Sequence, residues 1–163
     1  MAFGFNADEI LQMAERIERN GARFYRRAAE VCGADEETRA ALLELAEMEE
    51  DHERTFAEMR EALDAAESRS STFDPEGETA AYLAAMADGN VFGPEADPAD
   101  LACDKPTEEL LKIAIGLERE SILFYLGLRD LVPPASGRGK VEGVLKEEMS
   151  HVALLRDRLM ALR

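Results

Sequence analysis

The chain has 163 residues, of which 46% are apolar and 33% are charged, and its formal net charge is −16. This length and composition indicate a single soluble globular domain spanning 1–163 and exclude a disordered chain. The acidic excess disfavours binding to nucleic acid or to an anionic membrane, because both need clustered Lys and Arg. Abundant Ala, Leu, Glu, Arg and Met, with no Trp, favour an all-α fold.

The N-terminus and the cysteines predict a cytoplasmic protein. The opening MAFGFNADEI lacks the basic segment and the long apolar core of a signal peptide. No apolar run approaches the roughly 20 residues that cross a bilayer. Cys32 and Cys103 form no Cys-x-x-Cys motif, so we expect two free thiols in a reducing compartment. A redox pair between them is the less favoured alternative.

Two long helices are predicted in the first half of the chain. Asn6 followed by Glu9 has the pattern of a capping box, which opens a helix over about 7–31. Gly33 ends this helix, and the apolar periodicity resumes in a second helix over about 35–67.

A long connection over 68–106 follows, in which TAAYLAAMA is expected to form one short helix. Thr107 can cap a third helix over about 107–131. Pro133-Pro134 and a glycine-rich turn then precede a fourth helix over about 136–162.

The two halves of the chain are similar in sequence. LQMAERIERNGARFYRRA at 11–28 aligns without gaps with LKIAIGLERESILFYLGL at 111–128, at an offset of 100 residues. EEDHERTF at 49–56 aligns with EMSHVALL at 148–155, at an offset of 99. The chain therefore contains a duplicated helical hairpin, and two copies are too few for a solenoid.

Heptad spacing predicts which acidic side chains face the core of a four-helix bundle. The inward seam of each helix is apolar or small except at one level. The polar residues at that level are Glu18 in the first helix, Glu49 and His52 in the second, Glu118 in the third, and Glu148 and His151 in the fourth.

The positions of the predicted turns put these residues at the same height. Residues equidistant from the turn of an antiparallel hairpin lie side by side. Glu18 and Glu49 have their midpoint at 33.5, beside Gly33, and Glu118 and Glu148 have theirs at Pro133. We therefore expect four glutamates and two histidines to converge in the middle of the bundle.

Such a cluster predicts a dinuclear metal site. Buried carboxylates without partners are costly, and they raise one another's pKa. Two divalent cations balance the charge of four carboxylates beside two neutral imidazoles. Oxygen and imidazole ligands without thiolate suit iron or manganese, and zinc is a further option.

Simpler interpretations remain for the same residues. Glu18 and Glu118 could pair with arginines of neighbouring helices, and the histidines could be ordinary hydrogen-bonded core or surface residues. The remaining acidic residues near the motifs are expected to form a solvated face: Glu47, Glu50, Asp51, Glu53 and Glu147.

A Glu from each of two helices and a Glu-x-x-His from each of the other two is the ligand pattern of di-iron carboxylate bundles. On these motifs the chain resembles the ferritin-like superfamily, and within it the rubrerythrin-type proteins, over about residues 7–67 and 107–160. The resemblance implies a ferritin-like four-helix bundle built from two hairpins, joined by a long crossover with a short extra helix.

The resemblance also implies roles for individual residues. Glu49 and Glu148 would bridge two iron ions, Glu18 with His52 would complete one position, and Glu118 with His151 would complete the other. Tyr25 and Tyr125, two turns from Glu18 and Glu118, would lie beside these ligands and take part in hydrogen bonding or redox chemistry. Plain packing is the alternative for both tyrosines.

The chain departs from the rubrerythrin pattern in two ways. Typical rubrerythrins carry a further glutamate three residues after the ligand in the third helix, where this chain has Ser121; its counterpart in the first helix is Gly21. That glutamate supports an iron that moves during peroxide reduction, so its absence weakens the case for that mechanism. The chain also lacks the Cys-x-x-Cys pairs of a rubredoxin module, so reducing electrons are expected from an external donor.

The expected function is that of a di-iron oxidoreductase in which Fe(II) reacts with O₂ or hydrogen peroxide, as a peroxidase or a ferroxidase, in oxidative stress or iron homeostasis. The remaining set of six ligands is the symmetric one of bacterioferritin-like ferroxidase centres. A homodimer is expected, since ferritin-like bundles often pair along their sides. The alternatives are a non-catalytic iron-binding or storage protein and a structural bundle with zinc in a vestigial site.

Overall fold

The computed structural model describes residues 7–31, 35–63, 78, 106–132 and 134–162. Its long helices are α1 (Ala7–Val31), α2 (Glu36–Glu61), α5 (Thr107–Leu131) and α6 (Arg138–Ala161). A short 3-10 helix, η2 (Pro134–Ser136), precedes α6. These ranges contain no strand, which confirms the all-α prediction.

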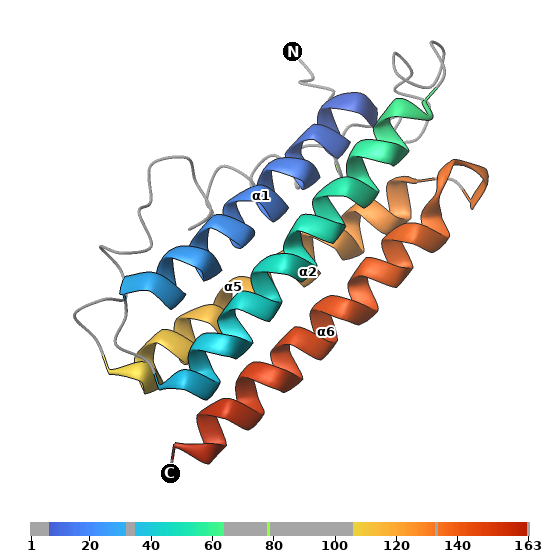
Figure 1. Ribbon diagram of the computed structural model, residues 1–163. Helices are drawn as coiled ribbons and strands as arrows, with labels where there is room; N and C mark the ends of the chain where they lie inside the picture. Colours follow the sequence, from blue (N-terminus) through green and yellow to red (C-terminus); the bar gives the residue numbers. More distant parts are fainter. Residues whose placement is uncertain (1–6, 32–34, 64–77, 79–105, 133, 163) are drawn as a thin grey trace.

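The four long helices lie side by side as a bundle (Figure 1). α1 is antiparallel to α2, and α5 is antiparallel to α6, so each half of the chain forms a helical hairpin. α2 and α5 run in the same direction. This is the arrangement of a bundle with one long crossover connection, as in ferritin-like folds.

The apolar seams predicted from the heptad spacing form the core. Their leucines, valines and alanines are buried in all four helices, and one continuous cluster joins them. Aromatic rings link the two hairpins, since Phe56 of α2 stacks on Tyr125 of α5 with ring centroids 5.1 Å apart. The core thus holds the four helices at a fixed height relative to one another.

The start of α2 has a clear local cause. Asp35 is its N-cap, and its side chain accepts hydrogen bonds of 2.9 Å from the backbone N–H and from the hydroxyl of Thr38. These bonds satisfy one of the backbone donors that a helix leaves unpaired at its N-terminus. The N-cap therefore fixes the residue at which α2 begins.

α2 ends at Glu61, earlier than the predicted end near residue 67. Its sequence contains no residue that stops a helix there. However, a residue near position 60 pairs across the hairpin with Ala7, where α1 begins. Beyond that point α2 would extend past the described part of α1, and packing contributes most of the stability of a helix in a protein.

The predicted starts of two helices also differ from the structure. The N-cap of α5 is Pro106, and Thr107 is its first helical residue and not its cap. α6 begins at Arg138 and not near residue 136, because the chain first forms η2 and then reverses at Gly137. Gly137 has φ +109°, a left-handed conformation that disfavours any residue with a Cβ.

Several predictions fall on residues outside the described ranges: the capping residue Asn6, the short helix TAAYLAAMA, nearly all of the crossover 68–106, and both Cys32 and Cys103. Within the described ranges, no helix has the length and apolarity required to span a bilayer.

Candidate metal centre

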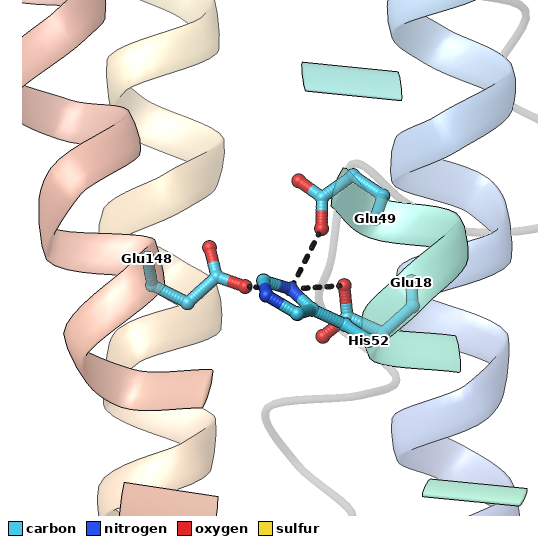
Figure 2. Close-up of side chains that lie close together, drawn as sticks. All are labelled: Glu18, Glu49, His52 and Glu148. Carbon is cyan, nitrogen blue, oxygen red and sulfur yellow. Dashed lines mark ion pairs between the residues drawn. The ribbon is translucent and has the colours of Figure 1, made fainter. Parts of the chain in front are cut away.

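The six predicted polar residues lie together at mid-height in the bundle. Glu18 comes from α1, Glu49 and His52 from α2, Glu118 from α5, and Glu148 and His151 from α6. Each is between 0% and 3% exposed. Figure 2 shows four of them, with Glu148 reaching from α6 towards Glu18, Glu49 and His52 on the facing hairpin.

One group of possible ligand atoms surrounds His52. Glu18, Glu49, His52 and Glu148 each offer one atom, and these atoms lie within 4.8 Å of one another. The imidazole Nδ1 of His52 lies 3.0 Å from Glu148 Oε1, 3.4 Å from Glu49 Oε2 and 3.6 Å from Glu18 Oε2. The Nδ1 side of the ring therefore faces the carboxylates (Figure 2).

A second group surrounds His151. Glu49, Glu118, Glu148 and His151 again offer atoms within 4.8 Å of one another. Nδ1 of His151 lies 3.4 Å from Glu118 Oε2, 3.4 Å from Glu148 Oε2 and 3.7 Å from Glu49 Oε1. The two imidazole rings stack with centroids 5.5 Å apart.

The two groups share Glu49 and Glu148. Each of these carboxylates turns one oxygen towards His52 and the other towards His151. Glu18 and Glu118 belong to one group each. The arrangement has the approximate twofold symmetry expected from the repeated hairpin.

The predicted tyrosines reach this level with their hydroxyl groups, and both residues are fully buried. Each hydroxyl donates a hydrogen bond across the bundle: Tyr25 of α1 to Glu118 Oε1 on α5, and Tyr125 of α5 to Glu18 Oε1 on α1. The ion pairs of Glu18 and Glu118 in the described part of the chain involve histidines and no arginine. The alternative of an arginine salt bridge at these two glutamates is therefore wrong.

Small residues make room for the shared carboxylates. A Cβ at Gly21 would lie 3.4 Å from both Cγ and Cδ of Glu49, at the limit of ordinary contact. Ser121 occupies the equivalent place on α5 and is buried, at 5% exposure. Both positions thus face the interior of the bundle without adding a carboxylate.

Burial and mutual repulsion shift the pKa values of the glutamates in the cluster. Burial raises the pKa of Glu49 well above its usual value, and the nearby carboxylates of Glu148 and Glu18 raise it further. Burial and the carboxylate of Glu148 raise the pKa of Glu118 to about 8. For Glu148, the close approach of Glu118 and His151 outweighs burial and lowers the pKa. Without a metal, protons on Glu49 and Glu118 relieve part of the repulsion.

Both histidines carry raised pKa values. Burial works to lower the pKa of His151, but the adjacent carboxylates of Glu118 and Glu148 raise it to about 9. The same opposition, with Glu148 and Glu18 as the dominant carboxylates, raises the pKa of His52 above its usual value. In the metal-free protein the imidazolium charges therefore balance part of the carboxylate charge.

The residues of the cluster leave polar atoms unpaired that two divalent cations would bind. Nδ1 of both histidines and both oxygens of Glu148 are buried and have no hydrogen-bond partner among the described residues. Buried polar atoms are normally paired, so several unpaired atoms that converge on one point are typical of a site that binds an ion. Carboxylates and imidazoles, with no thiolate, are ligands that iron and manganese accept.

One residue beside the centre makes a contact that the sequence did not predict. Glu147 was expected on the solvated face, and its side chain is indeed 56% exposed, but its Oε2 lies 2.8 Å from Nε2 of His52. The sequence signal was its place directly before Glu148, next to the seam. The other residues assigned to that face lie at the surface, where Glu50 and Glu53 pair with Arg26 and Arg19.

Comparison with known proteins agrees with this geometry. The rubrerythrin family model matches residues 9–90, half of the chain, and this range includes Glu18, Glu49 and His52. The chain belongs to the rubrerythrin family. No curated protein matches it in sequence.

The rubrerythrin-like chain also has a structural relative. A protein of Thermotoga maritima, described as a ferritin-like diiron-carboxylate protein, aligns with a TM-score of 0.70 over 98% of each chain at 23% identity. This likeness confirms the ferritin-like fold. Together, the family and the buried Glu/His cluster indicate iron binding.

Proposed function

We propose that this protein is a di-iron oxidoreductase that reduces hydrogen peroxide or O₂. The observation that supports it most is the pair of ligand groups sharing Glu49 and Glu148. Glu49 and Glu148 would therefore each contribute to holding both ions. Glu18 with His52 would complete one ion's ligands, and Glu118 with His151 the other's.

When bound, two ferrous ions supply two electrons, enough to convert hydrogen peroxide and two protons to two water molecules, or O₂ and two protons to hydrogen peroxide. The side chains around the centre exclude water and hold the ligands in place. The six ligand side chains are almost fully buried, which excludes bulk water and strengthens every electrostatic interaction in the site. The hydroxyls of Tyr25 and Tyr125 hold the terminal glutamates by hydrogen bonds and carry protons next to the reacting centre.

Between a peroxidase and a ferroxidase, the ligand set favours a ferroxidase-type centre. The buried position of Ser121 supplies no additional carboxylate to follow a moving ion. Re-reduction would come from an external protein or small-molecule donor. We also propose that the protein forms a homodimer.

The test is to load metal-free protein anaerobically with two Fe(II) per chain and then add hydrogen peroxide or O₂. We expect near-ultraviolet absorption of oxidised iron to appear in proportion to the iron bound. Glu49→Gln should slow this reaction by about 100-fold or more, because it weakens a ligand shared by both ions. The matched control is Glu47→Gln, which removes an exposed carboxylate of the same helix and should leave the rate unchanged.

The outcome separates the alternatives. Iron that binds but stays ferrous overturns the proposal. Continued uptake of ferric iron far beyond two ions per chain favours storage instead. Zinc as the only metal in protein purified from cells grown without added metal favours a structural bundle.

A further inference from the structure

The two histidines of the centre have different surroundings on the side that faces away from the carboxylates. Nε2 of His52 lies 2.8 Å from Oε2 of Glu147, which reaches across from α6. Nε2 of His151 is buried and has no hydrogen-bond partner among the described residues. The two rings are otherwise alike: both present Nδ1 to three carboxylates, and both are at most 2% exposed.

The difference between the two histidines follows from a difference between the two repeats in sequence. Glu147 directly precedes Glu148 on α6, and the offset of 99 residues between the repeats makes Met48 its counterpart on α2. A thioether is at best a weak hydrogen-bond acceptor. The ligand group around His151 therefore has a methionine, Met48, at the position where the ligand group around His52 has the carboxylate of Glu147.

A carboxylate on the outer nitrogen has a definite effect on a metal-binding histidine. When Glu147 accepts the Nε2–H of His52, the proton is fixed on that nitrogen and the lone pair of Nδ1 is directed at the ligand group. The partnership also makes Nδ1 a stronger electron donor. Within the described part of the chain His151 has no such partner, so its Nε2–H, when present, is buried at a cost.

From this asymmetry we infer that Glu147 is a positioning residue that makes the two metal positions unequal. The position formed with Glu18 and His52 binds its ion first and more tightly, and the position formed with Glu118 and His151 is the weaker one. This inference rests on the proposed metal centre, but it goes beyond it by assigning an order of loading and the residue that sets it.

The first test is a calorimetric titration of the metal-free protein with Zn²⁺, which is redox-inert and accepts the same ligands. We expect two binding steps whose affinities differ by at least about tenfold. Glu147→Ala should weaken the first step by about 10-fold to 100-fold and bring the two steps together. Glu147→Gln keeps an oxygen acceptor and should recover part of the difference.

Two further variants complete the design. Glu53→Gln removes a carboxylate next to His52 in sequence whose partner is the surface residue Arg19, so it should leave both steps unchanged. Met48→Glu supplies the missing carboxylate to the other half and should strengthen the second step by about tenfold. A merely structural role of Glu147 would change the stability of the protein without changing the ratio of the two steps.

The second test observes the rings directly, since the chain has only two histidines. In protein labelled with ¹⁵N-histidine, one equivalent of Zn²⁺ should shift the Nδ1 resonance of His52 while that of His151 stays in place. The Nε2–H proton of His52 should be protected from exchange, lose that protection in Glu147→Ala and retain it in Glu147→Gln.

The possible results are distinct. Equal binding steps, or a first ion bound at His151, overturn this inference and leave the proposed function standing. A protein that binds no Zn²⁺ and no Fe(II) at the cluster overturns both.

Discussion

At the residue scale, the tyrosines connect the two halves of the centre. Tyr25 and Tyr125 each donate to the terminal glutamate of the other hairpin, not to the one two turns away on their own helix. The family resemblance predicted that both residues lie beside the ligands. It did not indicate which glutamate each would reach, because that depends on how the two hairpins face each other.

Replacing either tyrosine by phenylalanine should destabilise the protein. Tyr25→Phe leaves a buried oxygen of Glu118 without its donor, which costs about 1–3 kcal/mol. Urea denaturation of the metal-free protein measures the loss. Thr55→Val removes a hydroxyl that bonds a backbone carbonyl at the exposed surface and should change stability far less. Equal effects of the two substitutions would contradict the role given to the tyrosine.

The titrating groups predict how the stability of the metal-free protein depends on pH. The pKa of Glu118 rises from 4.5 to about 8, and that of His151 rises from 6.5 to about 9. Both groups bind protons more tightly in the folded state, so their contribution is fully present below the ordinary pKa and is lost as the pH rises through the raised one.

The melting temperature of metal-free protein should therefore fall between about pH 6 and about pH 9. Differential scanning calorimetry across this range measures the change. The metal-loaded protein is the control, and its dependence should be weaker or reversed, because cations take the place of the protons and bind better as these dissociate. A melting temperature that rises with pH in the metal-free protein would rule out the protonated cluster.

At the element scale, the start of α6 depends on one glycine. Gly137 has φ +109°, and a Cβ there would come within 3.0 Å of the side-chain Cε of Met59 on α2. Gly137→Ala should cost at least about 1 kcal/mol, through backbone strain and displacement of Met59. Gly143→Ala, in the interior of α6 with nothing within 4 Å, should instead stabilise by about 0.5–1 kcal/mol. Urea denaturation distinguishes the opposite signs.

The helices and the six polar residues of the centre could be predicted because two independent constraints agree on them. Heptad spacing assigns Glu18 and Glu49 to the inward face, and the positions of the turns set them at one height. The end of α2 could not be predicted, since its sequence favours helix beyond Glu61 and its observed end matches the height at which α1 begins in the fold.

Glu147 shows a second limit of pattern-based reasoning. A position beside the seam normally faces solvent, and more than half of this side chain does. A glutamate has three rotatable bonds, however, so its carboxylate can turn back towards a buried ring that its backbone position does not face. The spacing of residues predicts the direction of the Cα–Cβ bond, but not the conformation of a long side chain.

At the scale of the whole molecule, the shared carboxylates tie one hairpin to the other. Glu49 belongs to α2 and Glu148 to α6, and each contributes to both ligand groups. A cation bound there stabilises the folded bundle, since the unfolded chain has no such site. At a hundredfold excess over the dissociation constant, this stabilisation is about 2.7 kcal/mol per site.

Addition of Mn²⁺ to the metal-free protein should raise its melting temperature, and Glu148→Gln should abolish most of that increase. Thermal unfolding with and without Mn²⁺ measures both effects. Glu142→Gln, an exposed glutamate of α6, is the matched control and should preserve the increase. An increase that persists in Glu148→Gln would place the bound cation elsewhere on this acidic protein.

The internal repeat has a consequence for the ancestry of the molecule. One hairpin provides Glu18, Glu49 and His52, and the other provides the equivalent three residues, so a lone hairpin holds half a centre. Two identical hairpins related by a dyad would hold a complete one. Because one chain carries both copies, neither hairpin has to match the other, and Glu147 and Met48 differ at equivalent positions.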